Sequence, residues 1–75
     1  MKQTELASVR RYKDITQQEM AKLLNLSVNG YSKKERGVNE FTLNEMFIIS
    51  SEFGRQIEDI FLPTDSTLRV IDKAE

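Results

Sequence analysis

Few side chains in this 75-residue sequence could do catalytic chemistry, because it contains no cysteine and no histidine. Their absence removes the thiolate and imidazole nucleophiles, the commonest general base, the usual zinc ligands and any disulfide. Carboxylates, lysines and tyrosines remain, but no pair of them resembles a nucleophile with its base. We therefore expect no catalytic residue, no metal site and no cofactor, and an enzyme is not predicted.

A run of small and polar residues indicates recognition rather than catalysis. If a helix extends from about Val28 to Glu35, one of its sides carries side chains that cannot serve a hydrophobic core. Such a side can enter a DNA major groove, about 12 Å wide, and contact base edges. The residues on this side are Val28, Asn29, Gly30, Ser32 and Lys33.

The charges are unevenly distributed along the chain. The formal net charge is −1, yet residues 1–37 hold eight Lys and Arg against four Asp and Glu, and residues 38–75 hold three against eight. A basic front half and an acidic back half suggest one face that meets an anion. Chance segregation in a short chain is the alternative explanation.

Local signals place the polar run on the second helix of a helix-turn-helix. Thr16 and Glu19 have the spacing of a capping box, which predicts a helix starting there. Asn25 tolerates the left-handed conformation that ends a helix, and Ser27 can cap the next helix. Two short helices joined by so tight a turn must cross closely, and the small Ala21 suits their contact.

Three further helices are expected to complete an all-α domain. One spans about residues 3–13, one begins at the cap Thr42 and ends at Gly54, and a short turn covers residues 57–61. The apolar residues at helical spacing are expected to face inward, and in the first helix the aliphatic stem of Lys13 is expected to join them. These residues are Leu6, Ala7, Val9, Tyr12, Met20, Ala21, Leu23, Leu24, Leu43, Met46, Ile49 and Phe53.

The start of the chain, residues 1–5, is polar and acidic, so no signal peptide is expected. No apolar stretch is long enough for a membrane span. Together with the lack of cysteine, these features favour a cytoplasmic location.

Across about Leu6 to Phe61 the sequence resembles the Cro/CI (XRE-type) helix-turn-helix family of small phage-type or bacterial transcriptional regulators. The resemblance implies a compact five-helix, lambda-repressor-like DNA-binding domain over residues 1–62, followed by a C-terminal tail or dimerisation arm at residues 63–75. It also implies a partner, double-stranded DNA, and a function: a sequence-specific repressor that binds a palindromic operator as a homodimer. The features that carry it are Arg10, Thr16-Gln17, Ala21, Leu26-Ser27, Glu35-Arg36-Gly37 and the segment from Gly54 to Phe61.

The resemblance implies that four residues read base edges: Val28, Asn29, Ser32 and Lys33. Asn29 would pair with adenine, Lys33 would donate to guanine, and Val28 would pack on a thymine methyl group. Taken alone, Asn29 or Lys33 would also fit an ordinary solvated surface. Gly30, which is about 1 kcal/mol less favourable than alanine inside a helix, would let this helix approach the DNA closely.

The resemblance implies phosphate contacts as well. Gln17 would donate to a phosphate, and Arg36 and Asn39 would bind phosphates on the far side. Arg10 and Glu35 would form a partly buried ion pair between the first and third helices. Its value would be the orientation of the recognition helix more than net stability.

Lys34 departs from the family pattern, because a large apolar residue usually anchors the third helix at this position. The aliphatic stem of Lys34 could substitute in part, and Phe41 could add a hydrophobic staple before Thr42.

Surplus apolar residues in the C-terminal half indicate a dimer interface. Phe47 and Ile48 make the fourth helix more apolar than one buried stripe requires, and Phe61 and Leu62 are expected to leave apolar surface at the end of the fold. Residues 67–71 could add an arm across the dimer.

The alternative function from another class is a protein-binding module on the same fold, such as an antirepressor or an antitoxin-like partner. Net negative charge, the glycine in the recognition helix and the missing anchor at Lys34 favour it. The dependence of binding on salt concentration discriminates between the DNA-binding and the protein-binding function, because DNA binding by charge neutralisation weakens steeply as the salt concentration rises.

Overall fold

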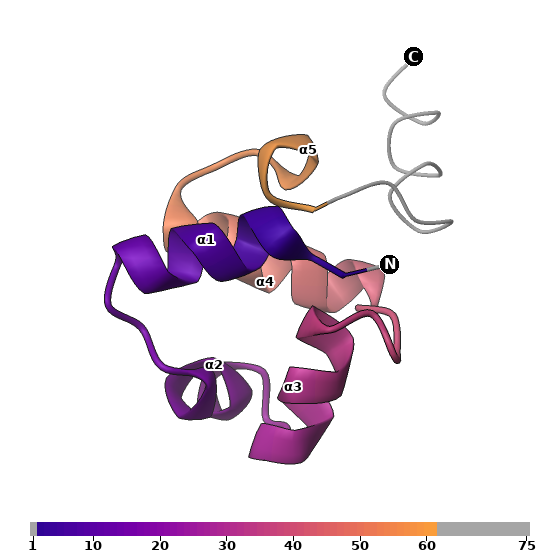
Figure 1. Cartoon of the computed structure of the whole chain (residues 1–75). Coiled ribbons are helices and arrows are strands. Elements are labelled where there is room, and N and C mark those ends of the chain that lie inside the picture. The colour runs from indigo at the N-terminus through magenta and orange to yellow at the C-terminus, as the bar shows by residue number, and fades with distance from the viewer. Residues whose placement is uncertain (1, 62–75) are drawn as a thin grey trace.

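The computed structural model describes residues 2–61, which form five helices and confirm the predicted all-α class. The predicted tail, residues 63–75, and Leu62 lie outside the described residues. The helices, labelled in Figure 1, are α1 (Thr4–Tyr12), α2 (Gln17–Leu23), α3 (Val28–Glu35), α4 (Leu43–Phe53) and α5 (Ile57–Ile60).

Side-chain caps fix where α2 and α4 begin. Thr16 Oγ1 accepts from the Glu19 N–H at 3.1 Å, and the Thr16 N–H donates to Glu19 Oε1 at 2.9 Å. In the same arrangement, Thr42 Oγ1 accepts from the Glu45 N–H at 3.1 Å, and the Thr42 N–H donates to Glu45 Oε1 at 2.8 Å. Each box satisfies two backbone donors that the helix itself leaves unpaired, so these two helix starts are encoded locally. Gly54 ends α4 with a left-handed φ of 66°.

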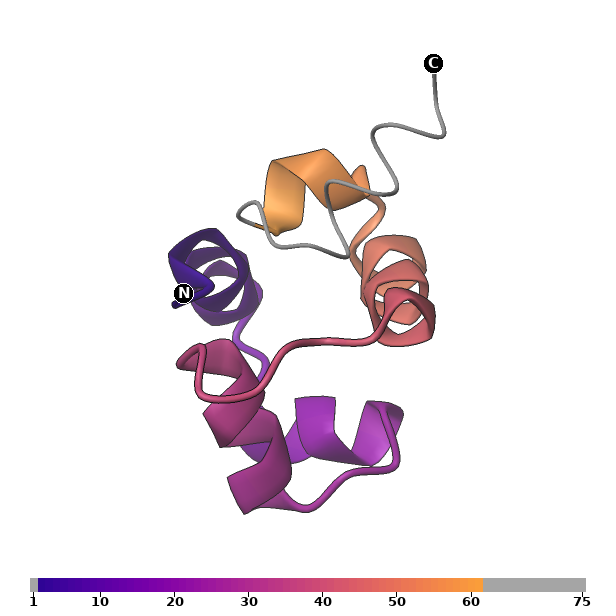
Figure 2. The same ribbon diagram turned by 90° about the vertical axis from the view of Figure 1, so that its right-hand side faces the viewer.

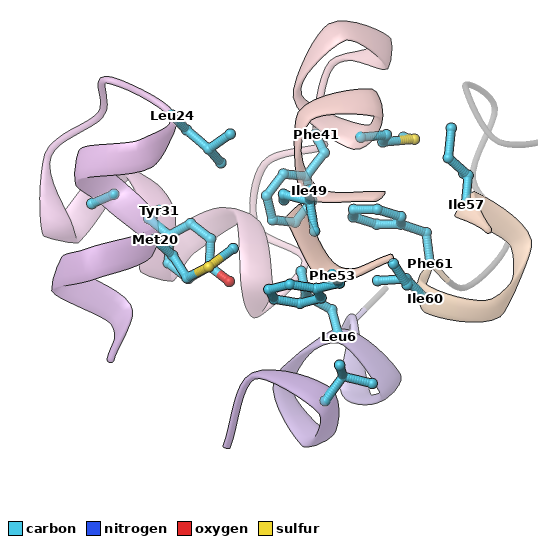
Figure 3. Close-up of a cluster of buried hydrophobic side chains, with 13 residues drawn as sticks. Leu6, Met20, Leu24, Tyr31, Phe41, Ile49, Phe53, Ile57, Ile60 and Phe61 are labelled. Atoms are coloured by element: carbon cyan, nitrogen blue, oxygen red, sulfur yellow. The ribbon is translucent and has the colours of Figure 1, made fainter. Parts of the chain in front are cut away.

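All five helices contribute to one hydrophobic core. In two perpendicular views, α5 lies at one end of the molecule and α2 with α3 at the other, with α1 and α4 between them (Figures 1 and 2). Each helix supplies a side chain that is at most 1% exposed, and Figure 3 shows these side chains converging. These residues are Leu6, Met20, Tyr31, Ile49 and Ile60.

A chain of edge-to-face aromatic contacts links α3 with the end of α5. The ring centroids of Tyr31 and Phe41 are 5.9 Å apart, and those of Phe41 and Phe61 are 5.3 Å apart. Phe41 precedes the cap of α4 and is only 2% exposed, which fits the predicted staple. Phe41 thereby anchors the loop from α3 to α4 to the core (Figure 3).

Three residues expected in the core are exposed instead. Tyr12 is 81% exposed at the last residue of α1, whose buried residues are Leu6, Ala7, Val9 and Arg10. Lys13, which follows the helix, is exposed as well, although its Nζ lies 6.0 Å from the Phe53 ring centroid. Leu23 is 38% exposed because Leu24 takes the inward position at the end of α2, and Leu43 is 36% exposed at the first turn of α4, where Phe41 fills the core.

Within residues 2–61, no helix is long and apolar enough to cross a lipid bilayer.

Candidate nucleic-acid interface

The turn between α2 and α3 has the tight geometry that its sequence predicts. Asn25 adopts a left-handed φ of 58°, and the Leu26 N–H donates to the Ala21 carbonyl at 2.8 Å. Ser27 caps α3 by accepting from the Gly30 N–H at 3.0 Å. Ala21 is 2% exposed, so its small side chain lies where the two helices meet.

The outward side of α3 is open to solvent. Asn29 and Lys33 are exposed, Val28 is 43% exposed, and Ser32 is half-buried. The opposite side is buried and carries Tyr31 and Glu35. The four predicted base-reading residues therefore share an accessible surface, while their contact with bases stays a prediction.

Gly30 lies against the cap of its own helix. A Cβ atom at this position would lie 3.1 Å from Ser27 Oγ and 4.0 Å from Leu26 Cβ. The glycine thus relieves a tight contact with the cap of its own helix. The close approach of Gly30 to DNA stays a prediction.

A buried ion pair ties α3 to α1, in agreement with the family resemblance. Arg10 Nε donates to Glu35 Oε2 at 2.9 Å, and Arg10 Nη2 donates to Glu35 Oε1 at 3.1 Å. The pair is bidentate, which fixes orientation as well as distance. Arg10 Nη1 also donates to the Ile15 carbonyl at 2.9 Å, so the guanidinium braces the loop that leads into α2.

Glu35 accepts from two further side chains. The Tyr31 hydroxyl donates to Oε2 at 2.7 Å, and Gln17 Nε2 donates to Oε1 at 3.1 Å. Burial pushes the pKa of Glu35 upward, but the hydrogen bonds from Arg10, Tyr31 and Gln17 outweigh it and leave the pKa below its usual value. Burial and Glu35 together raise the pKa of Tyr31. The network therefore holds an ionised carboxylate and a neutral phenol at the junction of α1, α2 and α3.

The role predicted for Gln17 is compatible with this network but more constrained than expected. One N–H of its amide is committed to Glu35, which leaves the second N–H for an outside acceptor. Sequence reasoning treated Gln17 and Glu35 as separate features. Their eighteen-residue separation gave no local signal of the hydrogen bond.

Lys34 anchors α3 through charge instead of the apolar contact usual in the family. Its Nζ lies 2.6 Å from Glu45 Oε1, and the two side chains are 15% and 11% exposed. The same carboxylate oxygen accepts from the Thr42 N–H. The cap of α4 is thus also the anchor of α3, a double role that the sequence analysis missed.

Arg36 and Gln17 line one hollow beside α1. The phosphate contacts expected of Arg36 and Gln17 stay predictions. The hydrogen bond from Gln17 to Glu35 joins the start of α2 to the end of α3 beside this hollow. Asn39 is exposed in the loop after α3, where its N–H donates to the Lys33 carbonyl at 3.3 Å.

The residues predicted for a dimer interface are only partly available. Phe47 is 54% exposed on the outer side of α4. Ile48 is half-buried and packs against the core. Phe61 is 3% exposed, so the expectation of apolar surface there is wrong, because its ring packs against Phe41. Leu62 lies outside the described residues.

Comparisons with known proteins agree with this geometry. Residues 6–60 match the helix-turn-helix family. The structure of the clp gene regulator ClgR from C. glutamicum shares the lambda-repressor-like fold, with a TM-score of 0.63 and 21% identity over 96% of this chain and 86% of that chain. No curated protein sequence matches the chain closely enough to count as a relative. The chain belongs to the Cro/CI (XRE-type) helix-turn-helix family, whose members are DNA-binding transcriptional regulators rather than enzymes.

Proposed function

We propose that this protein is a repressor that binds a palindromic operator as a homodimer, with α3 of each copy in a major groove. The observation that carries the proposal is the two-sided character of α3. Its buried side is tied to α1 and α2 through Glu35, and its outward side is polar and open. A helix held rigidly on one side and free on the other can present base-reading groups in a fixed register.

Base recognition is assigned to the open side of α3. Asn29 offers an amide that can pair bidentately with adenine, Lys33 can donate to guanine O6 and N7, and Val28 can pack on a thymine methyl group. Ser32, which is half-buried, can donate or accept at a neighbouring base. These assignments rest on exposure and on the family resemblance together.

Phosphate contacts are assigned to residues at the rim of the same surface. Gln17 keeps one amide N–H beyond its bond to Glu35, and Arg36 lines the same hollow. Asn39 is exposed in the following loop. Such contacts fix the position of the protein on the duplex without reading its sequence.

The homodimer is supported by size and by exposed apolar surface. A single module of this kind buries about 600–1,000 Å² on DNA, and two linked modules turn the second binding event into an intramolecular step. Phe47, a large apolar side chain on α4, is 54% exposed, and half-buried Ile48 adjoins it in the sequence. We assign the interface to this outer side of α4, with residues 63–75 as an additional arm.

Selection of bound duplexes from random DNA tests the proposal. The expected result is a short consensus repeated as an inverted pair, with centres about 10 base pairs apart, one turn of DNA. A consensus without inverted symmetry would contradict the dimeric operator. Recovery of no consensus would contradict sequence-specific binding altogether.

A further inference from the structure

Beside Gln17 the surface is hollowed by about 320 Å³. The lining comes from the N-terminal segment and α1, from the first residue of α2, and from the end of α3. Three exposed cationic residues, Lys2, Arg11 and Arg36, contribute to this lining. We refer to it as the basic hollow.

The charge of the basic hollow is not balanced from within. Glu35 is its one lining carboxylate, and it is already bound to Arg10, which lines the hollow too. Within residues 2–61, Lys2, Arg11 and Arg36 have no carboxylate partner. Three like charges around one concavity raise the local concentration of anions. An anion in the hollow would relieve their mutual repulsion.

Gln17 connects the basic hollow to the proposed DNA surface. Its amide lies at the start of α2, where the proposed function puts a backbone phosphate, and the same residue lines the hollow. From Gln17 the hollow extends along α1, away from the base-reading side of α3. A nucleic-acid strand that passes Gln17 would therefore reach Lys2 and Arg11 beyond the bases that α3 contacts.

We propose that the basic hollow binds a phosphodiester of the DNA strand that flanks the half-site. The inference rests on the proposed function, because it requires α3 to lie in the major groove. Guanidinium groups such as that of Arg11 can donate two N–H groups to one phosphate, and the Lys2 ammonium adds a compact positive charge. The contact strengthens binding without reading sequence, and it lengthens the footprint outside the operator.

The test combines a charge-removing variant with a charge-removing change in the DNA. Lys2→Gln with Arg11→Gln removes two exposed cations and leaves Gln17 and Arg36 in place. The matched control, Lys13→Gln with Arg55→Gln, removes two cations that do not line the hollow. Each protein is titrated with the selected duplex and with the same duplex carrying neutral methylphosphonate linkages just outside each half-site.

We expect wild-type and control proteins to bind the neutral-flank duplex several-fold more weakly than the normal duplex. The double variant should bind both duplexes equally, and its slope of log K against log salt should be shallower by roughly 0.9 for each lost phosphate contact. Circular dichroism should show all three proteins folded, because the substituted side chains are exposed.

Several outcomes would overturn the inference. If the neutral flank weakens DNA binding by the double variant and by the control to the same extent, the hollow does not contact the flanking phosphates. The proposed function would stand in that case. Saturable amide shifts around Lys2 and Arg11 on adding inorganic phosphate below millimolar concentration would assign the hollow to a small anion instead. Failure of the wild-type protein to prefer any duplex would refute the proposed function itself, and the inference with it.

Discussion

Replacement of Glu35 by glutamine removes the charge on which α1, α2 and α3 converge but keeps the side chain's shape. The Glu35 and Arg10 side chains are 6% and 10% exposed, so the substitution leaves a nearly buried, unpaired guanidinium. Removal of one partner of a buried ion pair lowers the free energy of unfolding by about 3–5 kcal/mol. The glutamine oxygen can still accept from Tyr31 or Gln17, so we expect about 3 kcal/mol, near the lower end of that range.

That loss is large for so small a domain. At roughly 0.05–0.15 kcal/mol per residue, a chain of 75 residues has a free energy of unfolding of about 4–11 kcal/mol. For a domain of this size each kcal/mol shifts the melting temperature by roughly 4–8 °C. Glu35→Gln should therefore lower the melting temperature by about 12–24 °C, and urea unfolding followed by circular dichroism should give the matching free energy.

A second substitution separates the effect of the unpaired Arg10 charge from the effect of the altered side chain at position 35. Arg10→Met combined with Glu35→Gln leaves no unpaired buried charge, so the double variant should be more stable than Glu35→Gln alone by about 2 kcal/mol. The reasoning is refuted if Glu35→Gln alone stays within about 1 kcal/mol of wild type. It is refuted equally if the effects of the two substitutions simply add, because additivity would mean that the pair has no coupling.

Four further expectations concern pH, base reading, phosphate contact and assembly. Because the folded-state pKa of Glu35 is lowered, its contribution to stability is present above its unfolded pKa and is lost as pH falls through the folded pKa; acid titration of unfolding should show this loss in wild type and not in Glu35→Gln. Asn29→Ala and Lys33→Ala should each relax preference at particular base positions by about 1–3 kcal/mol, measured on single-base operator variants. Gln17→Ala should weaken binding to operator and to random DNA by the same factor in parallel titrations. Phe47→Asp should give a folded monomer with much weaker operator affinity, as seen by sedimentation equilibrium and binding assays.

Each of these expectations has a contrary result. If wild type and Glu35→Gln lose stability in the same way as the pH falls, the Glu35 carboxyl does not govern acid stability. Unchanged base preference in both Asn29→Ala and Lys33→Ala would remove these residues from base reading. Loss of affinity at one base pair only would contradict a phosphate role for Gln17. A clean monomer mass for the wild-type protein, both free and on its operator, would exclude the homodimer.

The helix boundaries were predictable from sequence because they depend on local chemistry. Thr16 with Glu19 and Thr42 with Glu45 satisfy donors within one helical turn, and Asn25 carries its own conformational preference. Such signals need no knowledge of the rest of the fold. The polar side of α3 was predictable for a similar reason, since helical spacing alone separates Asn29 and Lys33 from Tyr31 and Glu35.

Features that depend on tertiary contacts were not predictable from local patterns. Tyr12 has the spacing of a core residue, but it is 81% exposed at the end of α1, beyond the buried Leu6, Val9 and Arg10. The Lys34–Glu45 ion pair joins residues eleven apart that belong to different helices. Phe61 is buried because Phe41, twenty residues earlier, reaches it from the loop before α4. Each of these features depends on how the helices are placed relative to one another.

The dependence of operator affinity on salt tests the central claim most directly. If α3 enters the major groove with Gln17, Arg36 and the basic hollow on the phosphates, log K should fall linearly with log salt concentration, with a slope of roughly −0.9 for each phosphate contacted. Two copies with several contacts each should therefore give a steep slope, together with a clear preference for operator over random duplex at every salt concentration. A slope near zero, or equal affinity for both duplexes throughout, would contradict the claim that this surface reads DNA.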